Sequence, residues 1–353
     1  MKKNVFASVS DRGVFLNESV LSPEFLPDVL PGREKEIQSL ALALKPFAEG
    51  RRGQGVLLHG PPGTGKTSCT KHVLDQLKDV AQSSECVYVN AWQHYTRQGV
   101  LTEVARQLGF PIPRRGLATD EVRQEVFSHI QRIGCRLVVA IDEADQLFHK
   151  KEDGVLYDLS RSNLPLAVLC LTNEPEVFEQ MDSRVKSSLS LNSLAFDRYN
   201  PLQLKAILRG RATKAFRKEA CPEEVVGLCA AFAAKNGGDA RVALDVLWKA
   251  GKACERRGGL VVEEGDVREA FLEQEKLNAS VKKRMQRLSL VEEQILAALS
   301  VPKYSGDLQE ELGIAERSLR RYVNQLESKR LVVVEEEQNV GGPGKRRLVR
   351  KVT

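Results

Sequence analysis

The chain has few of the residues that build disulfide frameworks, metal centres or membrane spans. It contains seven cysteines and five histidines, and the cysteines, at positions 69, 86, 135, 170, 221, 229 and 254, form no C-x-x-C pair. This spacing predicts free thiols in a reducing compartment and offers no zinc site. No apolar run approaches the roughly 20 residues that cross a bilayer, and the N-terminal apolar stretch is too short for a secretory signal. We therefore expect a cytoplasmic protein with no membrane partner.

Positive charge is unevenly spread along the chain. The formal net charge is +6, and residues 281–353 hold 15 Lys and Arg against 10 Asp and Glu, whereas residues 1–280 hold 38 against 37. The basic excess thus lies in the last fifth of the chain, which favours an anionic partner for that segment. A chain of 353 residues is long enough for two or three domains.

The stretch VLLHGPPGTGKT (56–67) carries the most specific signal in the sequence. Its first three residues are typical of a buried strand, and residues 60–67 match G-x-x-x-x-G-K-[ST], the P-loop pattern. Glycines let backbone N–H groups approach phosphate oxygens, and the start of the following helix adds positive potential. We expect ATP or ADP with Mg²⁺ as cofactors, with Lys66 on the β- and γ-phosphates and Thr67 on Mg²⁺. The predicted nucleotide-binding residues of this loop are Pro62, Gly63, Thr64, Gly65, Lys66, Thr67 and Ser68.

Two further apolar stretches end in polar residues that suit phosphate chemistry. RLVVAIDEAD (136–145) carries a predicted strand that ends in Asp142 and Glu143, and LAVLCLTN (166–173) carries another that ends in Asn173. Buried strands that alternate with helices indicate an α/β fold with a parallel sheet, which binds ligands at the carboxyl ends of its strands. We predict that Asp142 helps to hold Mg²⁺, that Glu143 polarises the attacking water, and that Asn173 orients water or the γ-phosphate. The alternative is that the two acids only begin a helix.

Together, GPPGTGKT, IDEAD and LTN resemble the motifs of an AAA+ ATPase. Other segments narrow the resemblance to the archaeal replication initiator family, kin to the eukaryotic origin recognition complex. These segments are LPGREKEIQSL (30–40), MDSRVKSSL (181–189), RYNPLQLKAILRGRA (198–212) and NGGDARVALDVLWKAG (236–251). The resemblance implies an AAA+ nucleotide-binding core over residues 1–195, a helical lid over 196–278 and a C-terminal winged-helix domain over 279–353.

The resemblance also implies roles for several residues outside the three core motifs. Arg241, in GGDAR, matches the arginine called sensor 2, which reaches the nucleotide phosphates, and Tyr199 and Arg211 match lid residues that contact nucleotide. Without the family, both arginines would be read as surface charges. Arg184 resembles an arginine finger that acts on a neighbouring copy's ATP site. Related proteins often place that arginine four residues later, where this chain has Ser188, so its identity stays open.

A segment between Asn90 and Leu137 adds a possible DNA contact. TRQGVLTEVARQLGF (96–110) has helical apolar spacing, and the basic loop PIPRRG (111–116) follows it. The resemblance implies an initiator-specific helical insertion that contacts DNA, with Arg97, Arg114 and Arg115 as the candidate residues. The alternative is a solvated helix hairpin.

Residues 288–353 have the pattern of a helix-turn-helix followed by a hairpin. In the third predicted helix (315–330), Leu319, Tyr322, Val323 and Leu326 share one face. The opposite face suits the DNA major groove, and a strand pair around GGPG (341–344) suits a basic wing beside an adjacent groove. The predicted DNA-binding residues are Arg317, Ser318, Arg320, Arg321 and Asn324 on the helix, and Lys345, Arg346 and Arg347 on the wing. The alternative is a winged helix used for protein contacts.

These observations predict an ATP-dependent initiator that binds duplex DNA at replication origins. The resemblance implies slow, switch-like ATP hydrolysis, the replicative helicase as a partner, and association with the nucleoid; other initiator copies on DNA are further candidate partners. Two alternatives stay open. A DNA-binding AAA+ transcription regulator or transposition accessory protein would share the P-loop and the winged helix, whereas a small-molecule kinase would need an acceptor pocket.

Overall fold

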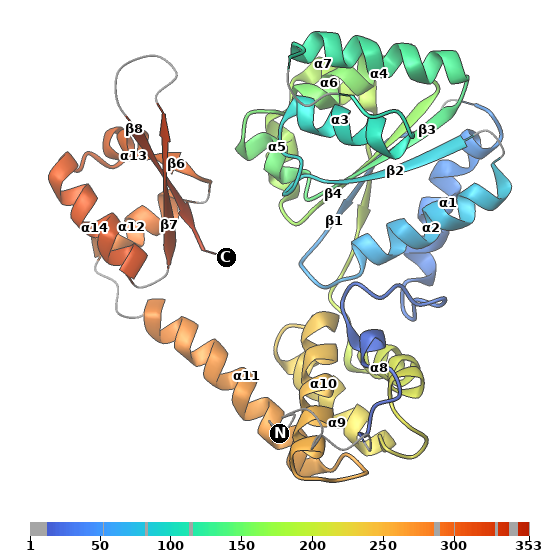
Figure 1. The fold of residues 1–353 in the computed structure, drawn as a ribbon, viewed down its shortest axis with the longest axis vertical. Helices are drawn as coiled ribbons and strands as arrows, with labels where there is room; N and C mark the ends of the chain where they lie inside the picture. Colours follow the sequence, from blue (N-terminus) through green and yellow to red (C-terminus); the bar gives the residue numbers. More distant parts are fainter. Residues whose placement is uncertain are drawn as a thin grey trace, which may run out of the picture. The chain divides into compact units, whose positions relative to one another are not determined.

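The computed structural model describes residues 13–51, 53–81, 84–112, 116–285, 290–299, 301–328, 331–338 and 345–352. The chain divides into two compact units, residues 1–271 and 272–353 (Figure 1). Each unit has a separate apolar core. The first unit holds a five-stranded sheet and a group of helices that we call the lid, and the second holds three helices and a three-stranded sheet.

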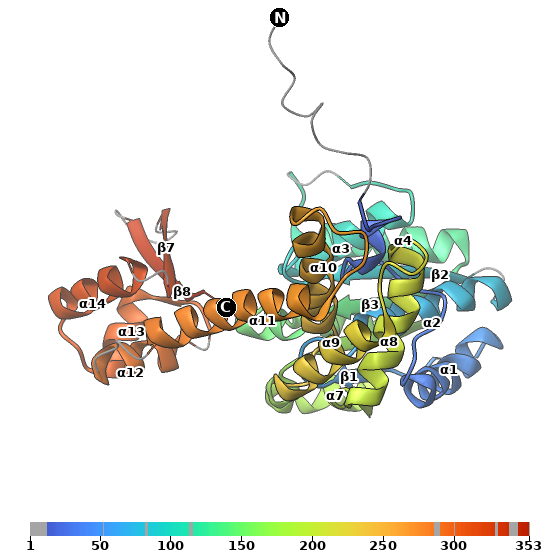
Figure 2. The same ribbon diagram turned by 90° about the horizontal axis from the view of Figure 1, so that it is seen from below.

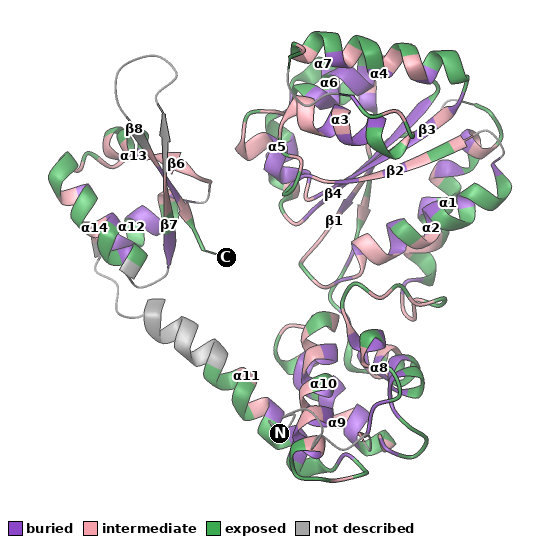
Figure 3. Ribbon diagram, viewed as in Figure 1, coloured by how far each residue is buried: buried purple, intermediate pink, exposed green. Residues whose placement is uncertain are grey.

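The five-stranded sheet is parallel, with the strand order β2-β3-β4-β1-β5. Strands β3 and β4 are almost wholly buried, as Figure 3 shows. Strands covered on both faces are rich in apolar residues along their whole length, because no face meets water. The strands are β1 (Val56–His59), β2 (Ser84–Asn90), β3 (Arg136–Asp142), β4 (Leu166–Thr172) and β5 (Asn192–Ala195).

Helices cover both faces of this sheet. Alternate residues of β3 point to opposite faces: Val138 packs in one core with α1 (Glu34–Ala48) and α2 (Lys66–Val80), whereas Val139 packs in the other. The second face is covered by α3 (Arg97–Gln107), α4 (Thr119–Ile133), α5 (Asp145–His149), α6 (Gly154–Arg161), η3 (Pro175–Gln180) and α7 (Ser183–Leu189). The α/β fold predicted from the sequence is thus confirmed. We call residues 91–135, which join β2 to β3 and contain α3 and α4, the insertion.

The lid begins after β5. It consists of α8 (Pro201–Ala215), α9 (Glu223–Lys235), α10 (Ala240–Arg256) and the first turns of α11 (Glu264–Met285). Helices α8, α9 and α10 pack against one another (Figure 2). Helix α8 starts at a capping box, in which the Asn200 side chain accepts from the Gln203 backbone N–H and the Gln203 side chain accepts from the Asn200 N–H. These reciprocal bonds satisfy backbone donors that the first turn would leave unpaired.

An N-terminal strap, residues 13–31, packs with the lid. It contains a short 3₁₀ helix, η2 (Glu18–Leu21). Phe15 forms a β-bridge with Phe216, and their ring centroids lie 4.6 Å apart. Val14, Phe15, Val20 and Leu21 are buried in the same core as the lid helices. A segment far from the lid in sequence is therefore part of the lid core.

The C-terminal unit has helices on one side of a small antiparallel sheet of strand order β6-β8-β7. The elements are α12 (Leu290–Ala298), β6 (Lys303–Tyr304), α13 (Ser305–Leu312), α14 (Glu316–Ser328), β7 (Val332–Gln338) and β8 (Lys345–Lys351). Three helices and a strand pair are thus present, as the sequence predicts, and Leu308, Leu319, Val323 and Val349 share their core. The predicted glycine tip of the hairpin lies outside the described residues.

The domain boundaries at 195/196 and 278/279 stay a prediction. The boundary between the two compact units falls after Phe271, within α11.

Candidate nucleotide-binding site

A cavity of about 510 Å³ lies at the carboxyl ends of the strands. Its walls come from three parts of the first unit: the P-loop and strand ends, the strap, and the lid. Nearly all residues predicted from the sequence to act on nucleotide line this one cavity: Pro62, Gly63, Thr64, Gly65, Lys66, Thr67, Ser68, Asp142, Glu143, Asn173, Tyr199, Arg211 and Arg241. Residues 23–31 of the strap line it as well, which the sequence patterns did not indicate.

The P-loop runs so close to the lid that two of its positions require glycine. Gly63 and Gly65 have φ of +70° and +89°, a left-handed conformation that favours glycine. A Cβ at Gly63 would lie 1.7 Å from Asp239 Oδ1, and one at Gly65 would lie 2.5 Å from the Tyr199 hydroxyl oxygen. Helix α2 begins at Lys66, directly after Gly65. Its first turn therefore presents backbone N–H groups at the loop, an arrangement that binds anions.

The Lys66 ammonium group is held inside the loop. Its Nζ donates to Gly60 O at 2.6 Å, to Pro61 O at 3.0 Å and to Asn173 Oδ1 at 2.8 Å. Burial lowers the Lys66 pKa, and the nearby charges of Asp142 and Glu143 oppose that shift. The lysine thus connects the P-loop to the end of β4.

Two acidic side chains meet beside this lysine. The Asp142 carboxylate accepts from the Thr67 hydroxyl at 2.6 Å and, through the same oxygen, from the Tyr88 hydroxyl. Glu143 adopts a left-handed backbone conformation (φ 53°), and its Oε2 accepts from Asn173 Nδ2 at 3.1 Å. Burial raises the pKa of Glu143 to about 7, with further contributions from the negative charges of Asp142 and Asp145.

These groups fit a magnesium ion. The donors at this point are oxygens, from the Thr67 hydroxyl and the Asp142 carboxylate, and oxygen donors are the ones that Mg²⁺ prefers. The charges of Asp142 and Asp145 also add to the burial that raises the pKa of Glu143, so negative charge is crowded there. A divalent cation would offset that crowding.

The first turn of α10 brings Arg241 to the P-loop. Asp239 caps this helix by accepting from the Arg241 N–H at 2.7 Å, and the Ala240 N–H donates to Gly63 O at 3.2 Å. The Arg241 guanidinium lines the cavity and pairs with the Asp239 carboxylate at 3.2 Å. The lid is therefore bonded directly to the phosphate-binding loop.

Arg211 and Tyr199 line the cavity but have specific protein partners. The buried Arg211 guanidinium donates to Val20 O at 2.6 Å and to Phe25 O at 2.8 Å, and lies 4.8 Å from the Phe25 ring centroid. Burial lowers the pKa of Arg211 and raises that of Tyr199 to about 12. Arg211 thus fastens the strap across the cavity, a role that spacing in the sequence did not indicate.

Arg33 is a functional residue that sequence reasoning missed. Only 3% of it is exposed. Its Nε donates to Thr64 O at 2.8 Å, its Nη2 donates to Asp197 O, and its guanidinium lies 4.0 Å from the Tyr199 ring centroid. It therefore joins the P-loop to the chain segment that enters the lid. The one local signal is a basic residue directly before helix α1, paired with Glu36 one turn later.

Arg184 lies apart from this cavity. Its side chain is 72% exposed and pairs with Asp182 at 2.9 Å, and it is not among the described residues that line the cavity. Ser188, the alternative position, donates through its hydroxyl to Ser160 O at 2.9 Å. The structure leaves the arginine-finger assignment a prediction, because this chain contains only one side of such an interface.

Arg97, a predicted DNA contact, has carboxylate partners within the chain. Its Nη2 donates to Asp120 Oδ1 at 2.8 Å and to Asp158 Oδ1 at 2.9 Å, and its Nε donates to Asp158. The guanidinium thus ties α3 to α4 and α6, and its contact with DNA stays a prediction. Arg114 and Arg115 lie outside the described residues.

The predicted DNA-binding face of the C-terminal unit is solvent-exposed. Leu319, Val323 and Leu326 of α14 are buried, and the residues on its other face are exposed, except for the half-buried Ser318: Arg317, Arg320, Arg321 and Asn324. The Arg347 guanidinium of β8 donates to Asn324 Oδ1 at 3.0 Å, which joins the helix to the hairpin. The side chains of Lys345 and Arg346 lie outside the described residues.

A parallel α/β sheet with a P-loop, an acidic pair, an Asn at the next strand end and a helical lid that places an arginine in the cavity defines the class of AAA+ ATPases. Two family descriptions match in order: an AAA domain over residues 50–181 and a Cdc6 AAA+ ATPase-type lid domain over residues 205–272. Among the residues described, no helix is both long and apolar enough to cross a membrane.

Similar proteins narrow the class to a family. The chain is 36% identical to ORC1-type DNA replication protein 1 of Sulfurisphaera tokodaii over 72% of this chain and 65% of that protein. It is 34% identical to the protein of that name from Sulfolobus acidocaldarius over 77% and 70%, respectively. The structure of the Aeropyrum pernix ORC1 protein in complex with DNA has a TM-score of 0.71 and 32% identity, covering 96% of this chain and 93% of that one. This chain therefore belongs to the ORC1/Cdc6-type replication initiators, as the motifs predicted, and it spans about two thirds of the length of the first two relatives.

Arg33 provides a test of the junction between the P-loop and the lid. We expect Arg33→Ala to lower the free energy of unfolding by about 2–3 kcal/mol, because it leaves buried carbonyl groups without a charged donor. It should also weaken ATP binding, because Thr64 and Tyr199 lose their common partner. Chemical denaturation with and without ATP measures both effects.

Arg51→Ala is the matched control for Arg33→Ala, since Arg51 is exposed and pairs with Glu49 at the surface. A surface pair contributes roughly 0–1 kcal/mol. If the two variants behave alike, Arg33 is only another ion pair and the junction is held by other contacts.

Proposed function

We propose that this chain is an ATP-regulated initiator that binds duplex origin DNA and helps to recruit the replicative helicase. The observation that carries the proposal is the single cavity in which the P-loop, Asp142, Glu143, Asn173 and the lid residue Arg241 meet. Membership of the ORC1/Cdc6-type family supports the role in replication. Helicase recruitment rests on the family resemblance, as does association with the nucleoid.

The cavity suits a nucleoside triphosphate with its phosphates at the P-loop. Lys66 and the first turn of α2 supply positive charge and N–H donors. A phosphate oxygen would replace one of the neutral oxygens that now accept from Lys66 Nζ. The strap and the apolar residues Ile207 and Leu244, which also line the cavity, would hold the base and ribose.

The acidic pair suits slow hydrolysis. When bound at Thr67 and Asp142, Mg²⁺ would neutralise charge on the phosphates. We assign Glu143 to polarise the attacking water and Asn173 to orient it, since Asn173 already bonds both Lys66 and Glu143. The Glu143 carboxylate suits a general base when nearby cations such as Lys66 and Arg241 keep it ionised.

Hydrolysis would act as a switch through contacts between the lid and the P-loop. The Ala240 N–H bonds Gly63 O, and Arg33 joins Thr64 O to Asp197 O. Loss of the γ-phosphate would therefore change the contacts between the P-loop and the start of the lid. Arg241 would exchange Asp239 for a phosphate when nucleotide binds, because its guanidinium is about half exposed and lines the cavity.

The C-terminal unit suits duplex DNA as a winged helix. Helix α14 has an apolar inner face and a basic outer one, the layout of a recognition helix. Strands β7 and β8 form the antiparallel pair of a wing. We propose the domain limits 1–195, 196–278 and 279–353 on this basis, with Arg317, Ser318, Arg320, Arg321 and Asn324 on the helix and Lys345, Arg346 and Arg347 on the wing.

Occupancy of the chain along the genome tests the whole proposal. We expect it at replication origins. Occupancy mainly at promoters would instead establish a DNA-binding AAA+ regulator.

Two substitutions separate nucleotide binding from hydrolysis. Lys66→Ala should weaken ATP binding by about 10-fold or more, because charge-assisted bonds to phosphate are lost. Glu143→Gln should keep ATP affinity and slow turnover about 10²- to 10⁴-fold, because it removes a general base. Equilibrium binding and single-turnover hydrolysis measure the two effects.

Lys78→Ala is the control for these substitutions, since it removes an exposed lysine of the same helix. Normal hydrolysis by Glu143→Gln would assign the base to another residue. Unchanged ATP affinity in Lys66→Ala would remove the P-loop from the nucleotide site.

The arginine-finger assignment predicts rescue between copies. Lys66→Ala and Arg184→Ala should each be inactive in an assembly on DNA, whereas an equimolar mixture should recover part of the ATPase activity. In mixed pairs, Lys66→Ala subunits would supply Arg184 to the intact site of the partner. Lack of recovery in mixtures whose assembly is verified would show that Arg184 does not act in trans; Arg268→Ala, an exposed arginine paired within α11, is the control.

The wing predicts a change in salt dependence. If Arg347 contacts a phosphate, Arg347→Ala should reduce the slope of log affinity against log salt by about 0.9 for every duplex sequence. If Arg321 reads a base edge, Arg321→Ala should cost about 1–3 kcal/mol and mainly reduce discrimination between origin and scrambled duplexes. Salt titrations of both variants measure the difference. Arg268→Ala is the control and should keep the wild-type affinity and salt slope. If Arg347→Ala keeps them too, the hairpin does not contact DNA and is a solvated turn.

A further inference from the structure

Strand β2 is an edge strand whose outer side is covered by one side chain of the insertion. It pairs with β3 on its other side. The Tyr88 N–H donates to Gln107 Oε1 at 3.1 Å, and Gln107 Nε2 donates to Tyr88 O at 2.7 Å. The Gln107 amide thus replaces a neighbouring strand at this residue. Edge groups need such a partner, because unpaired backbone groups are costly and promote aggregation.

The side chain of Tyr88 reaches the acidic pair. Its hydroxyl donates to the Asp142 oxygen that also accepts from Thr67. Lys71 Nζ lies 4.5 Å from the centroid of the Tyr88 ring, which fixes the ring from the side of α2. Burial and the Asp142 charge raise the Tyr88 pKa, so the hydroxyl stays a donor at neutral pH.

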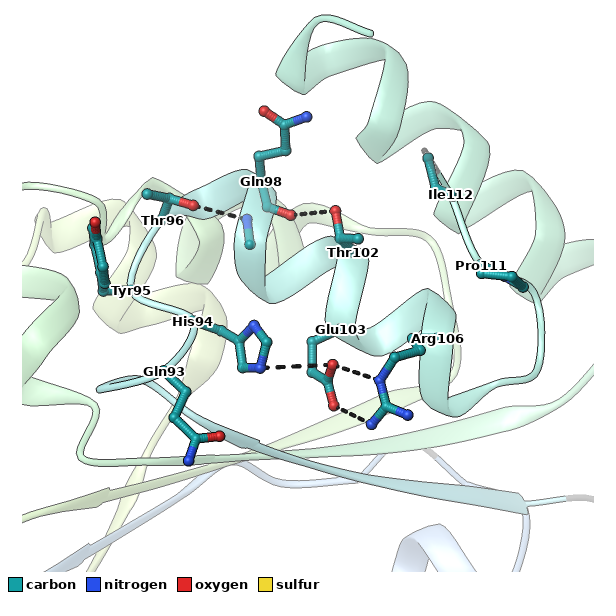
Figure 4. A pocket seen from close by; sticks show the side chains of 11 residues that line it. Gln93, His94, Tyr95, Thr96, Gln98, Thr102, Glu103, Arg106, Pro111 and Ile112 are labelled. Atoms are coloured by element: carbon teal, nitrogen blue, oxygen red, sulfur yellow. Dashed lines mark hydrogen bonds and ion pairs between the residues drawn. The ribbon is translucent and has the colours of Figure 1, made fainter. Parts of the chain in front are cut away.

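The amide nitrogen of Gln107 that donates to Tyr88 O also has a partner within α3. This Nε2 donates to Glu103 Oε1 at 2.7 Å, and Arg106 donates to both oxygens of the same carboxylate at 2.7 and 2.8 Å. His94 Nε2 lies 3.6 Å from Glu103 Oε2. Figure 4 shows His94, Glu103 and Arg106 converging in a cavity of about 380 Å³ on this face of α3.

Glu103 is buried, whereas the Arg106 guanidinium is 60% exposed. The hydrogen bonds from Arg106 are the main cause that lowers the Glu103 pKa to about 2. Glu103 is therefore a buried anion, and the arginine that neutralises it is exposed to solvent. A ligand anion that bound Arg106 would compete with Glu103. Such competition would release the Glu103 carboxylate from Arg106, and Glu103 is the acceptor that holds Gln107 Nε2.

We propose that Gln107 and Tyr88 are positioning residues that connect the insertion helix α3 to the Asp142 carboxylate. Neither lines the nucleotide cavity; they hold Asp142 in place from the outer edge of the sheet. The inference rests on the proposed function, since it concerns regulation of the same ATP site. Because coupling between two sites is reciprocal, Mg²⁺ with nucleotide at Asp142 should in turn change the affinity of the α3 surface for DNA phosphates.

The magnesium dependence of nucleotide affinity is the first test. The affinity of a fluorescent ATP analogue is measured with Mg²⁺ and with EDTA for the wild type, Tyr88→Phe, Gln107→Met and the double variant. We expect the ratio of the two affinities to fall about 5- to 10-fold in Tyr88→Phe, because one bond to a charged group is lost. Gln107→Met should lower the ratio too, and the double variant should go no further than Tyr88→Phe, because residues in one network are not additive.

Two matched controls come from the same region. Tyr95→Phe removes the hydroxyl of an exposed tyrosine, and Gln98→Met replaces another glutamine of α3 that lines the cavity. Both should keep the wild-type ratio. Melting temperatures exclude unfolding, and Gln107→Asn, one methylene shorter, is the second variant if Gln107→Met does not fold. Hydrogen exchange of the Tyr88 amide in nucleotide-free protein should speed up in the Gln107 variants and not in Gln98→Met.

The second test is the affinity for duplex DNA with and without Mg²⁺ and the ATP analogue. In the wild type the two affinities should differ by about 5-fold or more, and in Tyr88→Phe and Gln107→Met they should approach one another. If the wild type binds no DNA, the proposed function fails, while the magnesium ratios still decide the role of the two residues. If Gln107→Met keeps the wild-type magnesium ratio, or if the two substitutions are strictly additive, the connection is overturned and Gln107 serves only to cover the edge of the sheet.

Discussion

The close approach of the lid to the P-loop is the constraint on which the nucleotide site depends. At Gly63 and Gly65 the loop is pressed against Asp239 and Tyr199 with no room for a Cβ, and the Ala240 N–H bonds the loop directly. The first turn of α2, the Lys66 ammonium and Arg241 consequently face one cavity. A lid attached only by its linker would leave that arginine free to leave the cavity. The strap adds a second attachment, because it is buried in the lid core and also lines the cavity.

Negative charge in this site is balanced from several directions. Asp142, Glu143 and Asp145 lie within four residues at the end of one strand. Burial raises the pKa of Glu143 to about 7, and the charges of Asp142 and Asp145 add to that shift. Lys66 opposes this from the P-loop and Arg241 from the lid. The Asp145 carboxylate accepts from Thr172 at the end of β4. An acidic cluster of this kind is stable in the protein because neutral donors and nearby cations share its charge, and it is ready to accept a cation.

The insertion is attached to the rest of the core by two kinds of contact, one to a neighbouring helix and one to the edge of the sheet. Arg97 ties α3 to α4 and α6 through carboxylates, and α6 lies outside the insertion. Gln107 instead bonds the backbone of Tyr88 in β2, and the Tyr88 hydroxyl bonds Asp142 of the acidic pair. The C-terminal unit has its own apolar core, so its basic surface is formed independently of the nucleotide site. The hydrogen bond between Arg347 and Asn324 orders that surface from within.

The sequence by itself determined the P-loop, the strands that lead into Asp142 and Asn173, and the basic C-terminal helix. Each of these is a local pattern, in which backbone conformation and side-chain chemistry are set by residues a few positions apart. The role of the lid residue Arg241 came from the family resemblance instead. The sequence did not reveal Arg33, Tyr88 or Gln107, or the carboxylates that hold Arg97. Their partners lie far away in the chain: Arg33 bonds Asp197, Tyr88 bonds Asp142, and Arg97 bonds Asp158. Only tertiary structure decided these roles, because a buried polar group must find a partner wherever the fold brings one, and no spacing within the chain shows which distant group that will be.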